Sequence, residues 1–300
     1  MSMATAPHPL RSPLRSVVAD YVTLTKPRIM MLILITAYGA MAFAADGLPS
    51  ARLTVLTLFG LGLSSGGASA LNHVIDRDLD ARMRRTAGRP VASGRVSVDA
   101  ATGFGIGLIV SSTAVLAAYV NVLTAALALS GALFYVVVYT IWLKRRTPQN
   151  IVIGGAAGAV PPLVGWAAVT GQVGLAALFM FALVFYWTPP HFWALAILAK
   201  DDYAAAGVPM LPVVRGDRET ARQILLYTVL LVGLSLLPYL SQTFGLVYLV
   251  SAAVLGGWFL LLAVRLLRDT SRANARRLFF YSLAYLALMF AAIGIDRINF

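Results

Sequence analysis

The chain has 300 residues, of which 59% are hydrophobic and only 12% are charged, and its formal net charge is +12. A soluble domain carries about twice that charged fraction, so the composition excludes an ordinary soluble globular protein. The sequence contains no cysteine, which excludes disulfides and thiolate metal sites.

Nine apolar runs follow one another along the chain. Each approaches the ~20 residues that span about 30 Å of hydrocarbon, and such segments must be helical because lipid offers no water to backbone groups. The sequence therefore predicts an all-α polytopic membrane protein, with residues 1–28 as a cytoplasmic tail and residues 29–300 as a single nine-helix domain. The runs are Ile29–Ala45, Leu53–Leu71, Ala101–Val120, Val122–Trp142, Ile151–Thr170, Val173–Ala199, Ile224–Leu240, Phe244–Val264 and Phe279–Ile295.

The basic residues predict the orientation of the chain. All of the 24 lysines and arginines except Arg52 and Arg297 fall in the N-terminal tail or in the connections after the second, fourth, sixth and eighth runs. Because basic loops stay in the cytoplasm, this pattern puts the N-terminus inside and Phe300 outside. The positive charge is thus explained by membrane orientation and requires no nucleic acid.

An acidic motif follows the second run. Asn72, Asp76 and Asp80 are spaced by four residues, so on a helix their side chains form one stripe with ~6 Å of rise between neighbours. Two carboxylates one turn apart repel unless a cation lies between them, and Mg²⁺ typically binds one or two carboxylates together with substrate phosphates. Asp78 points off this stripe, and His73 lies one residue off it, so we expect His73 to tolerate Gln or Ala.

Arginines follow this motif directly. Their planar donors suit phosphate oxygens, so the segment predicts an anion site beside the acidic stripe. The alternative is that these acids and arginines pair only with one another in a solvated loop. The arginines are Arg84, Arg85, Arg89 and Arg95.

A second unusual segment closes the sixth run. Pro189 and Pro190 are expected to break the helix there, and His191 follows them within apolar sequence. An ionisable group inside a membrane is a candidate functional residue, although a hydrogen-bonded core histidine is the alternative. Asp201 and Asp202 then end the segment, where Lys200 could neutralise one of them.

The two motifs end runs that are four spans apart, both on the cytoplasmic side. This arrangement predicts two similar halves around a central cavity that opens toward the cytoplasm, with acidic clusters at its mouth.

These motifs resemble those of the UbiA-like intramembrane prenyltransferases, and within them the branch that acts on heme. The resemblance covers nearly the whole chain. The acidic motif is typical of the superfamily, and the Pro-Pro-His segment with the segment after it is typical of the heme branch. The matching segments are Thr25-Lys-Pro-Arg28, Asn72-x-x-x-Asp76-x-x-x-Asp80, Met83-x-Arg-Thr-x-x-Arg-Pro90, Tyr139-Thr-x-x-Leu-Lys-Arg145, Asn150-Ile-Val-Ile-Gly-Gly-x-Ala-Gly158, Trp187-Thr-Pro-Pro-His-Phe-Trp193 and Asp202-Tyr-x-x-Ala-Gly-x-Pro-Met-Leu-Pro212.

The resemblance implies a reaction. A farnesyl group would pass from farnesyl diphosphate to a vinyl group of heme B, and addition of water would give heme O for terminal oxidases. The enzyme would work in the lipid bilayer, with heme A synthase or oxidase assembly proteins as further partners.

The resemblance also implies roles for particular residues. It assigns Mg²⁺ to Asn72, Asp76, Asp80 and Asp202, and catalysis to Asp76, Asp80, Tyr139 and Lys144. It assigns substrate binding to Asn72, Arg85, Arg89, Lys144, His191, Lys200, Asp202 and Tyr203. One departure is that His191 stands where relatives acting on soluble aromatic acids carry the first Asp of their second motif, so the two halves are not expected to hold metal equally.

Two other functions fit part of the pattern. A sister transferase acting on a quinone precursor or another flat acceptor would keep the Asp motifs but would not need His191. A transporter would place charged residues near the membrane midplane, whereas the charges here gather at one side.

Overall fold

The computed structural model describes residues 13–296, and within that range the regular structure is entirely helical. Residues 1–12 of the predicted tail, together with Arg297 and Phe300, lie outside the described residues. The elements are α1 (Pro13–Leu24), α2 (Pro27–Ala44), α3 (Ala51–Ile75), α4 (Arg77–Arg82), α5 (Val98–Tyr119), α6 (Val122–Leu133), η1 (Phe134–Leu143), α7 (Asn150–Thr170), α8 (Leu175–Leu198), α9 (Lys200–Ala205), α10 (Leu211–Leu240), α11 (Leu246–Arg268) and α12 (Arg272–Asp296).

The nine predicted spans are confirmed. Within residues 13–296, nine helical segments are long and apolar enough to cross a membrane, with α6 and η1 together forming the fourth. The structure adds α1 within the predicted tail and the short helices α4 and α9 in two connections. Helix α10 begins earlier than predicted, at Leu211, and contains a kink at Gly216, whose φ of 79° lies in the left-handed region.

Short polar side chains set the ends of several spans. The side chain of Ser50 accepts a hydrogen bond from the Leu53 amide at the start of α3, and Ser97 accepts one from Ala100 at the start of α5. Val120 and Asn121 form the whole connection between α5 and α6, and Asn121 is the N-cap of α6. Its side-chain oxygen caps α6 through the Thr124 amide, and its side-chain nitrogen donates to the Ala167 carbonyl of α7. These caps satisfy backbone donors that the first helical turn leaves unpaired.

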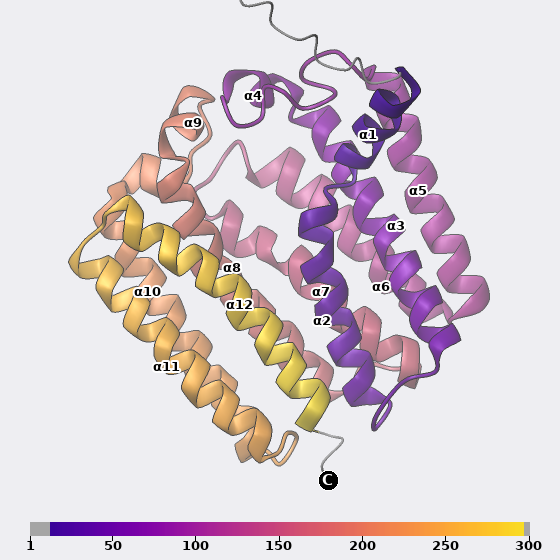
Figure 1. The fold of residues 1–300 in the computed structure, drawn as a ribbon, viewed down its shortest axis with the longest axis vertical. Coiled ribbons are helices and arrows are strands. Elements are labelled where there is room, and N and C mark those ends of the chain that lie inside the picture. The colour runs from indigo at the N-terminus through magenta and orange to yellow at the C-terminus, as the bar shows by residue number, and fades with distance from the viewer. Residues whose placement is uncertain (1–12, 297–300) are drawn as a thin grey trace, which may run out of the picture.

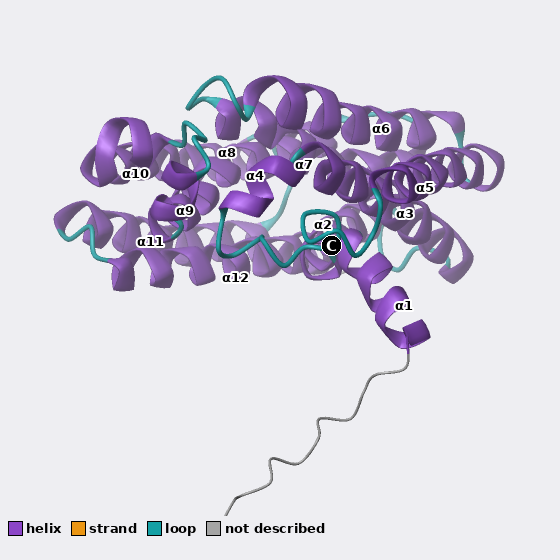
Figure 2. Ribbon diagram, turned by 90° about the horizontal axis from the view of Figure 1, so that it is seen from above, coloured by secondary structure: helices purple, strands orange, loops and turns teal. Residues whose placement is uncertain are grey.

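The helices run side by side between two ends of the molecule, and one end carries α4 and α9 (Figure 1). Seen from that end, α4 and α9 lie together above the long helices (Figure 2). Small residues allow close packing between helices, as is common in membranes. At Gly39 on α2, an added Cβ would lie 2.7 Å from the Phe290 carbonyl oxygen, so α2 and α12 touch near the opposite end.

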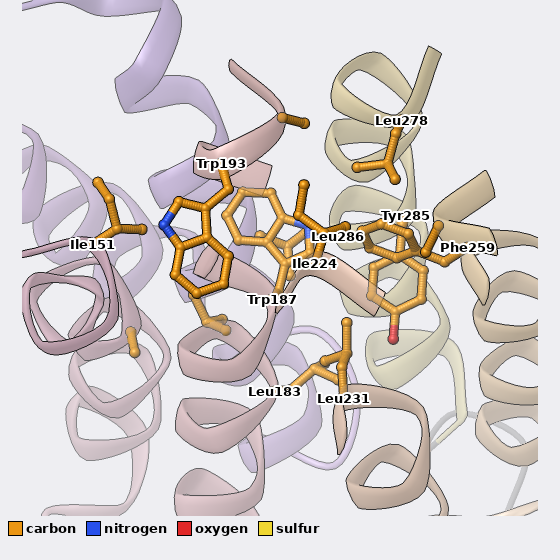
Figure 3. Close-up of a cluster of buried hydrophobic side chains, with 14 of the residues drawn as sticks. Ile151, Leu183, Trp187, Trp193, Ile224, Leu231, Phe259, Leu278, Tyr285 and Leu286 are labelled. Carbon is orange, nitrogen blue, oxygen red and sulfur yellow. The ribbon is translucent and has the colours of Figure 1, made fainter. Parts of the chain in front are cut away.

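The largest hydrophobic core fills the space between α8, α10, α11 and α12. Its aromatic members include Trp187, Trp193, Phe259 and Tyr285, all nearly inaccessible to solvent (Figure 3). Aliphatic side chains such as Ile224 fill the gaps between these rings. This packing holds α8, the helix that carries the Pro-Pro-His segment, in a fixed position beside α12.

The prediction of a break at Pro189 and Pro190 is wrong. Helix α8 runs unbroken from Leu175 to Leu198, with both prolines inside it. The surrounding residues are buried, and the hydroxyl of Thr188 donates 2.8 Å to the Val184 carbonyl oxygen in the turn before the prolines. Protein therefore covers the backbone that the prolines disturb, which is the condition under which membrane helices tolerate proline.

Candidate active site at the α3–α4 junction

Asp76 lies at the centre of a buried polar cluster. It ends α3 and precedes α4, with φ −89° and ψ 5°, so the predicted continuous helix over residues 72–80 is interrupted at this residue. The i→i+4 backbone bonds nevertheless continue, from the Asp76 amide to Asn72 and from the Asp80 amide to Asp76. The predicted stripe therefore survives the change of helix: Asn72, Asp76 and Asp80 are all buried.

The two carboxylate oxygens of Asp76 differ. Oδ2 accepts hydrogen bonds from Asn72 Nδ2 at 2.7 Å and from the ammonium of Lys144. Oδ1 is buried and has no hydrogen-bond partner among the described residues, and the guanidinium of Arg145 is 4.0 Å away. An unsatisfied buried carboxylate oxygen is costly, so Oδ1 is available for a ligand.

Asn72 connects three elements. Its Nδ2 also contacts Thr140 Oγ1 at 3.1 Å, and its Oδ1 accepts a hydrogen bond from Lys26 Nζ at 2.7 Å. Thr140 belongs to η1, a π-helix in which residues five apart share a face. The same winding brings Lys144 one turn beyond Tyr139, since the Lys144 amide bonds to the Tyr139 carbonyl. The unusual helix thus directs both Thr140 and Lys144 at the acidic motif.

Asp80 is paired with Arg89. The Arg89 guanidinium contacts both carboxylate oxygens at 2.8 Å, and the Asp80 side chain is fully buried. The Thr86 hydroxyl donates to the Asp80 carbonyl oxygen at 3.1 Å, which holds the intervening loop against α4. Arg89 therefore lies beside the acidic stripe, as the sequence predicted.

Lys26 was not among the predicted site residues, yet it belongs to the cluster. It precedes α2 in a left-handed conformation with φ 52°, and its Nζ also lies 3.4 Å from the Tyr135 hydroxyl. Burial, and then the positive charges of Arg89 and Lys144, lower the pKa of Lys26 to about 7. The available sequence signal was its place beside Pro27, at the start of a membrane helix.

Two tyrosines of η1 form one wall of the cluster. The rings of Tyr135 and Tyr139 stack with centroids 5.5 Å apart, and Tyr139 packs against Gly154 of α7, where any larger residue would collide with the ring. Tyr203 of the second motif is buried in the hydrophobic core against which Tyr139 also packs.

Asp78 stands outside the cluster, as predicted. It pairs with Arg145 at 2.6 Å on the exposed surface, and this guanidinium lowers the pKa of the Asp78 carboxyl. Arg95 is likewise used elsewhere, since it pairs with Asp20 of α1 at 3.0 Å. Arg85 is exposed and forms no ion pair with any described residue, so it can reach a bound anion.

His191 is buried within α8 rather than placed after a break. Its Nδ1 lies 2.7 Å from the Ser282 hydroxyl of α12, and its ring stacks between Trp187 at 4.3 Å and Phe279 at 4.8 Å. Trp187 is held in turn by a hydrogen bond from its Nε1 to the Ser282 carbonyl oxygen. His191 as a whole is only 7% exposed, so its ring is buried in a flat aromatic stack.

The acids after His191 have other partners than predicted. Lys200 pairs with Asp217 of α10 at 3.0 Å, and so the expected neutralisation of Asp201 or Asp202 is wrong. Asp202 instead lies 3.7 Å from Arg84, which connects the second motif to the loop after α4. Because α9 turns the chain after α8, Lys200 faces the start of α10 rather than its neighbours in sequence.

A divalent cation would fit the first motif if substrate phosphates supplied its remaining ligands. No group of three or more acidic, histidine or cysteine side chains among residues 13–296 is arranged to hold a metal ion by itself. Mg²⁺ needs only one or two carboxylates when substrate phosphates supply the remaining ligands. The orphaned Oδ1 of Asp76 offers such a ligand, whereas Asp80 is engaged by Arg89 and would have to share its oxygens.

Comparison with known proteins identifies the family. The model of the UbiA prenyltransferase family matches residues 33–288. The chain belongs to the UbiA prenyltransferase family. Among its relatives, a protein named protoheme IX farnesyltransferase from Gloeobacter violaceus is 53% identical over 93% of this chain and 92% of its own length. One of the same name from Roseiflexus sp. strain RS-1 is 49% identical over 95% of this chain, and the chain spans about half, 53%, of that relative.

Solved structures share the fold. A digeranylgeranylglyceryl phosphate synthase superposes with a TM-score of 0.77 at 19% identity, covering 94% of this chain and 99% of that one. A UbiA homolog from Archaeoglobus fulgidus bound to DMAPP and Mg²⁺ has a TM-score of 0.66 at 18% identity, covering 93% and 99%. The nine-span UbiA fold predicted from the sequence is therefore confirmed, while a central cavity opening toward the cytoplasm stays a prediction.

Proposed function

We propose that the chain farnesylates heme B to give heme O. The C–O bond of farnesyl diphosphate breaks and its electron pair leaves with diphosphate. The vinyl group of heme B then supplies the electrons of a new C–C bond to the allylic carbon. Water adds to the resulting carbocation beside the porphyrin ring and loses a proton, which completes the hydroxyethylfarnesyl group. Relatives that are about half identical over nearly the whole chain carry the name of this activity.

The charge balance of the buried cluster carries this proposal. Lys144 and Arg89 balance the two carboxylates of Asp76 and Asp80, and Lys26, which is charged below about pH 7, adds positive charge to the cluster. This added charge, together with the exposed Arg85, suits a multiply charged anion such as diphosphate. Fixed positive groups at the place where negative charge develops stabilise a leaving group without reorganisation.

Mg²⁺ is the expected metal. A related structure holds Mg²⁺ together with a prenyl diphosphate, and here Asp76, with Asn72 and Asp80 beside it, would hold the ion. When bound, the ion would neutralise diphosphate oxygens and so make diphosphate a better leaving group. Asp202 is the proposed acid of the second motif.

The remaining residues bind and position the substrates. Lys144, Arg89 and Arg85 offset diphosphate charge, and Lys200 and Tyr203 complete the polar rim from the second motif. The stacked rings of Tyr135 and Tyr139 offer their faces to the allylic cation, which aromatic rings attract. The isoprenoid chain lies among apolar helices, where early access of water is limited. His191 and its aromatic stack serve the heme acceptor.

The test is direct product analysis. Membranes containing the full chain are supplied with heme B, farnesyl diphosphate and Mg²⁺, and extracted hemes are compared with heme B and heme O standards. We expect heme O only when all three are present. Formation of a prenylated quinone precursor without heme O would refute the proposal and favour the sister activity.

The proposed membrane topology has a separate test. Nine spans and the family make this a multi-pass membrane protein. We propose the cell inner membrane, a cytoplasmic tail over residues 1–28 and a single domain over residues 29–300, with heme A synthase or oxidase assembly proteins as neighbours. The chain has no native cysteine, so an introduced cysteine is the only residue that a thiol reagent can label. Cysteines at Gly88 and Val214 should label only from the cytoplasm, and one at Asn121 only from outside. Reversal of any one of them contradicts the topology.

A further inference from the structure

A pocket lies between the end of α8 and the start of α12 and shares no residue with the carboxylate cluster. It has a volume of about 690 Å³, within the range of about 300–1,000 Å³ that is typical of small-molecule sites. Guanidinium groups, an aromatic ring and aliphatic carbons line it together. The lining residues are Leu198, Arg272, Ala273, Arg276, Arg277 and Phe280.

The three arginines of this pocket are not neutralised by the chain. Among the described residues, no acidic side chain forms an ion pair with any of them. Arg272 donates to the Leu198 carbonyl oxygen at 2.7 Å, and the guanidinium of Arg276 lies over the Phe280 ring at 5.7 Å. The nearby acid Asp269 is occupied by Ser271 and Asn274.

The position of these arginines concentrates positive potential further. They occupy the first two turns of α12, where the helix dipole is positive and cations are locally unfavourable. A bound anion would offset this cost. Positive charge on loops at this end accounts for the orientation of the protein, but it does not require three cations to line one pocket.

The pocket adjoins the aromatic stack that contains His191. The ring of Phe279, which stacks on His191, also lies edge to face with the ring of Phe280 in the pocket wall, with centroids 5.3 Å apart. On the other side, Leu198 is seven residues beyond His191 on α8, or about 10 Å along the helix. A flat molecule with acidic groups at one edge could therefore place those groups at the arginines and its ring system toward His191.

We propose that the α8–α12 pocket binds the propionate carboxylates of the porphyrin acceptor through Arg276 and Arg277, with the macrocycle directed toward His191. Planar guanidinium groups match carboxylates in a bidentate arrangement. An anionic phospholipid headgroup would satisfy the same charges, but it has no flat ring system to pack on the adjoining aromatic stack. This inference rests on the proposed function, since it locates the acceptor of that reaction.

The test uses the full chain purified in nanodiscs of neutral phospholipid. Heme B and its dimethyl ester, which lacks the carboxylates, are titrated separately and followed by the Soret band. Binding of farnesyl diphosphate is measured in parallel. The test variant is Arg276→Gln with Arg277→Gln. The matched control is Arg265→Gln, which removes a charge from the neighbouring end of α11, where Arg265 lies 5.8 Å over the Trp258 ring.

We expect the double variant to bind heme B about tenfold or more weakly, with unchanged affinity for farnesyl diphosphate and for the ester. The control should behave as the native chain does. Equal heme B affinity in the double variant overturns the inference, as does an ester that binds the native chain as tightly as heme B. Loss of co-purified anionic phospholipid with unchanged heme affinity assigns the pocket to lipid instead. The single variant Arg277→Gln, combined with thermal melting, separates these outcomes from misfolding.

Heme O formation separates this inference from the proposed function. A native chain that binds heme through these arginines but forms no heme O refutes the function and retains the site. A double variant that forms heme O with an unchanged KM for heme B refutes the site and retains the function.

Discussion

The ends of α3 and α8 both lie at the end of the bundle that carries α4 and α9 (Figure 1), yet they carry different chemistry. At the end of α3, Asn72 and Asp76 are held by cations and hydroxyls from η1 and from the start of α2. Near the end of α8, the buried polar group is His191, which has one hydroxyl partner and two aromatic neighbours. One end is a network of charges and the other is a flat stack of rings.

This difference points to different substrates at the two helix ends. The charged network suits a diphosphate with Mg²⁺, because its cations can meet phosphate oxygens and the unpaired carboxylate oxygen of Asp76 can meet the metal. The aromatic stack suits a planar acceptor. Arg84 and Asp202 join the two ends at 3.7 Å, so the substrates can meet at one face of the bundle (Figure 2).

The largest expected effect tests the charged end. Asp76→Asn keeps the size of the side chain but removes its charge and weakens its contact with Lys144. We expect turnover to fall by about 10²–10³-fold, the range for loss of one preorganised electrostatic group. Heme O formation and Mg²⁺-dependent binding of farnesyl diphosphate are the measurements.

The matched control for Asp76 is Asp78→Asn. Asp78 is also an aspartate and is two residues away, but it is exposed and pairs with Arg145. Its turnover should stay within about threefold of the native value, as is usual for surface ion pairs. Near-normal turnover in Asp76→Asn, or equal losses in both variants, would remove Asp76 from the metal and diphosphate site.

The next effect tests the aromatic end. His191→Ala should weaken heme B binding by roughly 10- to 100-fold, because it removes a buried ring from between Trp187 and Phe279. Farnesyl diphosphate should still bind with Mg²⁺. A lost or shifted Soret band in the purified protein is the measurement.

His191→Phe then separates packing from chemistry. Phenylalanine keeps a flat ring in the stack but cannot bind iron or hydrogen-bond to Ser282. Restored heme affinity in this variant would limit His191 to packing. If His191→Ala instead retains heme and loses diphosphate, the residue belongs to the charged end.

Much of this comparison could be predicted from the sequence. The nine spans follow from hydrophobic length, and the stripe of Asn72, Asp76 and Asp80 follows from a spacing of four. Neither prediction depends on tertiary contacts. Both features are present in the structure, and the stripe continues across the helix boundary at Asp76.

Long-range contacts account for what the sequence could not reveal. The π-helix η1 has no pattern that distinguishes it from an α-helix, although it directs Thr140 and Lys144 at the site. Lys26 forms a hydrogen bond with Asn72, 46 positions away. Lys200 pairs with Asp217 rather than with its neighbours in sequence because α9 turns the chain. Such pairings depend on how the helices pack.

A smaller effect, dependent on pH, tests Lys26. Its pKa is lowered to about 7, so in the free protein this ammonium loses its charge as pH rises through about 7. Diphosphate favours the charged form, and its affinity should therefore fall by up to roughly tenfold between pH 6 and pH 8. The measurement is farnesyl diphosphate affinity across that range.

Lys26→Met and Lys26→Arg provide the controls. The ionisation of the diphosphate itself is common to all three proteins and cancels in the comparison. Lys26→Met should bind weakly at every pH, whereas Lys26→Arg should keep its affinity above pH 7. A pH profile that is unchanged by Lys26→Met would show that another group is responsible.

The smallest effect concerns His73, which lies one residue from the charged stripe. It is only 1% exposed, and neither ring nitrogen has a hydrogen-bond partner among the described residues. Unsatisfied buried nitrogens cost free energy, and so an apolar residue of similar volume should fit at least as well.

We therefore expect His73→Leu to melt at the same temperature as the native protein or a few degrees higher, with turnover within about twofold. His73→Ala and His73→Gln should also retain turnover, but His73→Ala should melt lower because it leaves a cavity. Thermal melting with and without farnesyl diphosphate measures both effects. A folded His73→Leu protein that no longer gains stability from farnesyl diphosphate would place the imidazole within the anion site, and the boundary of the charged end would then include residue 73.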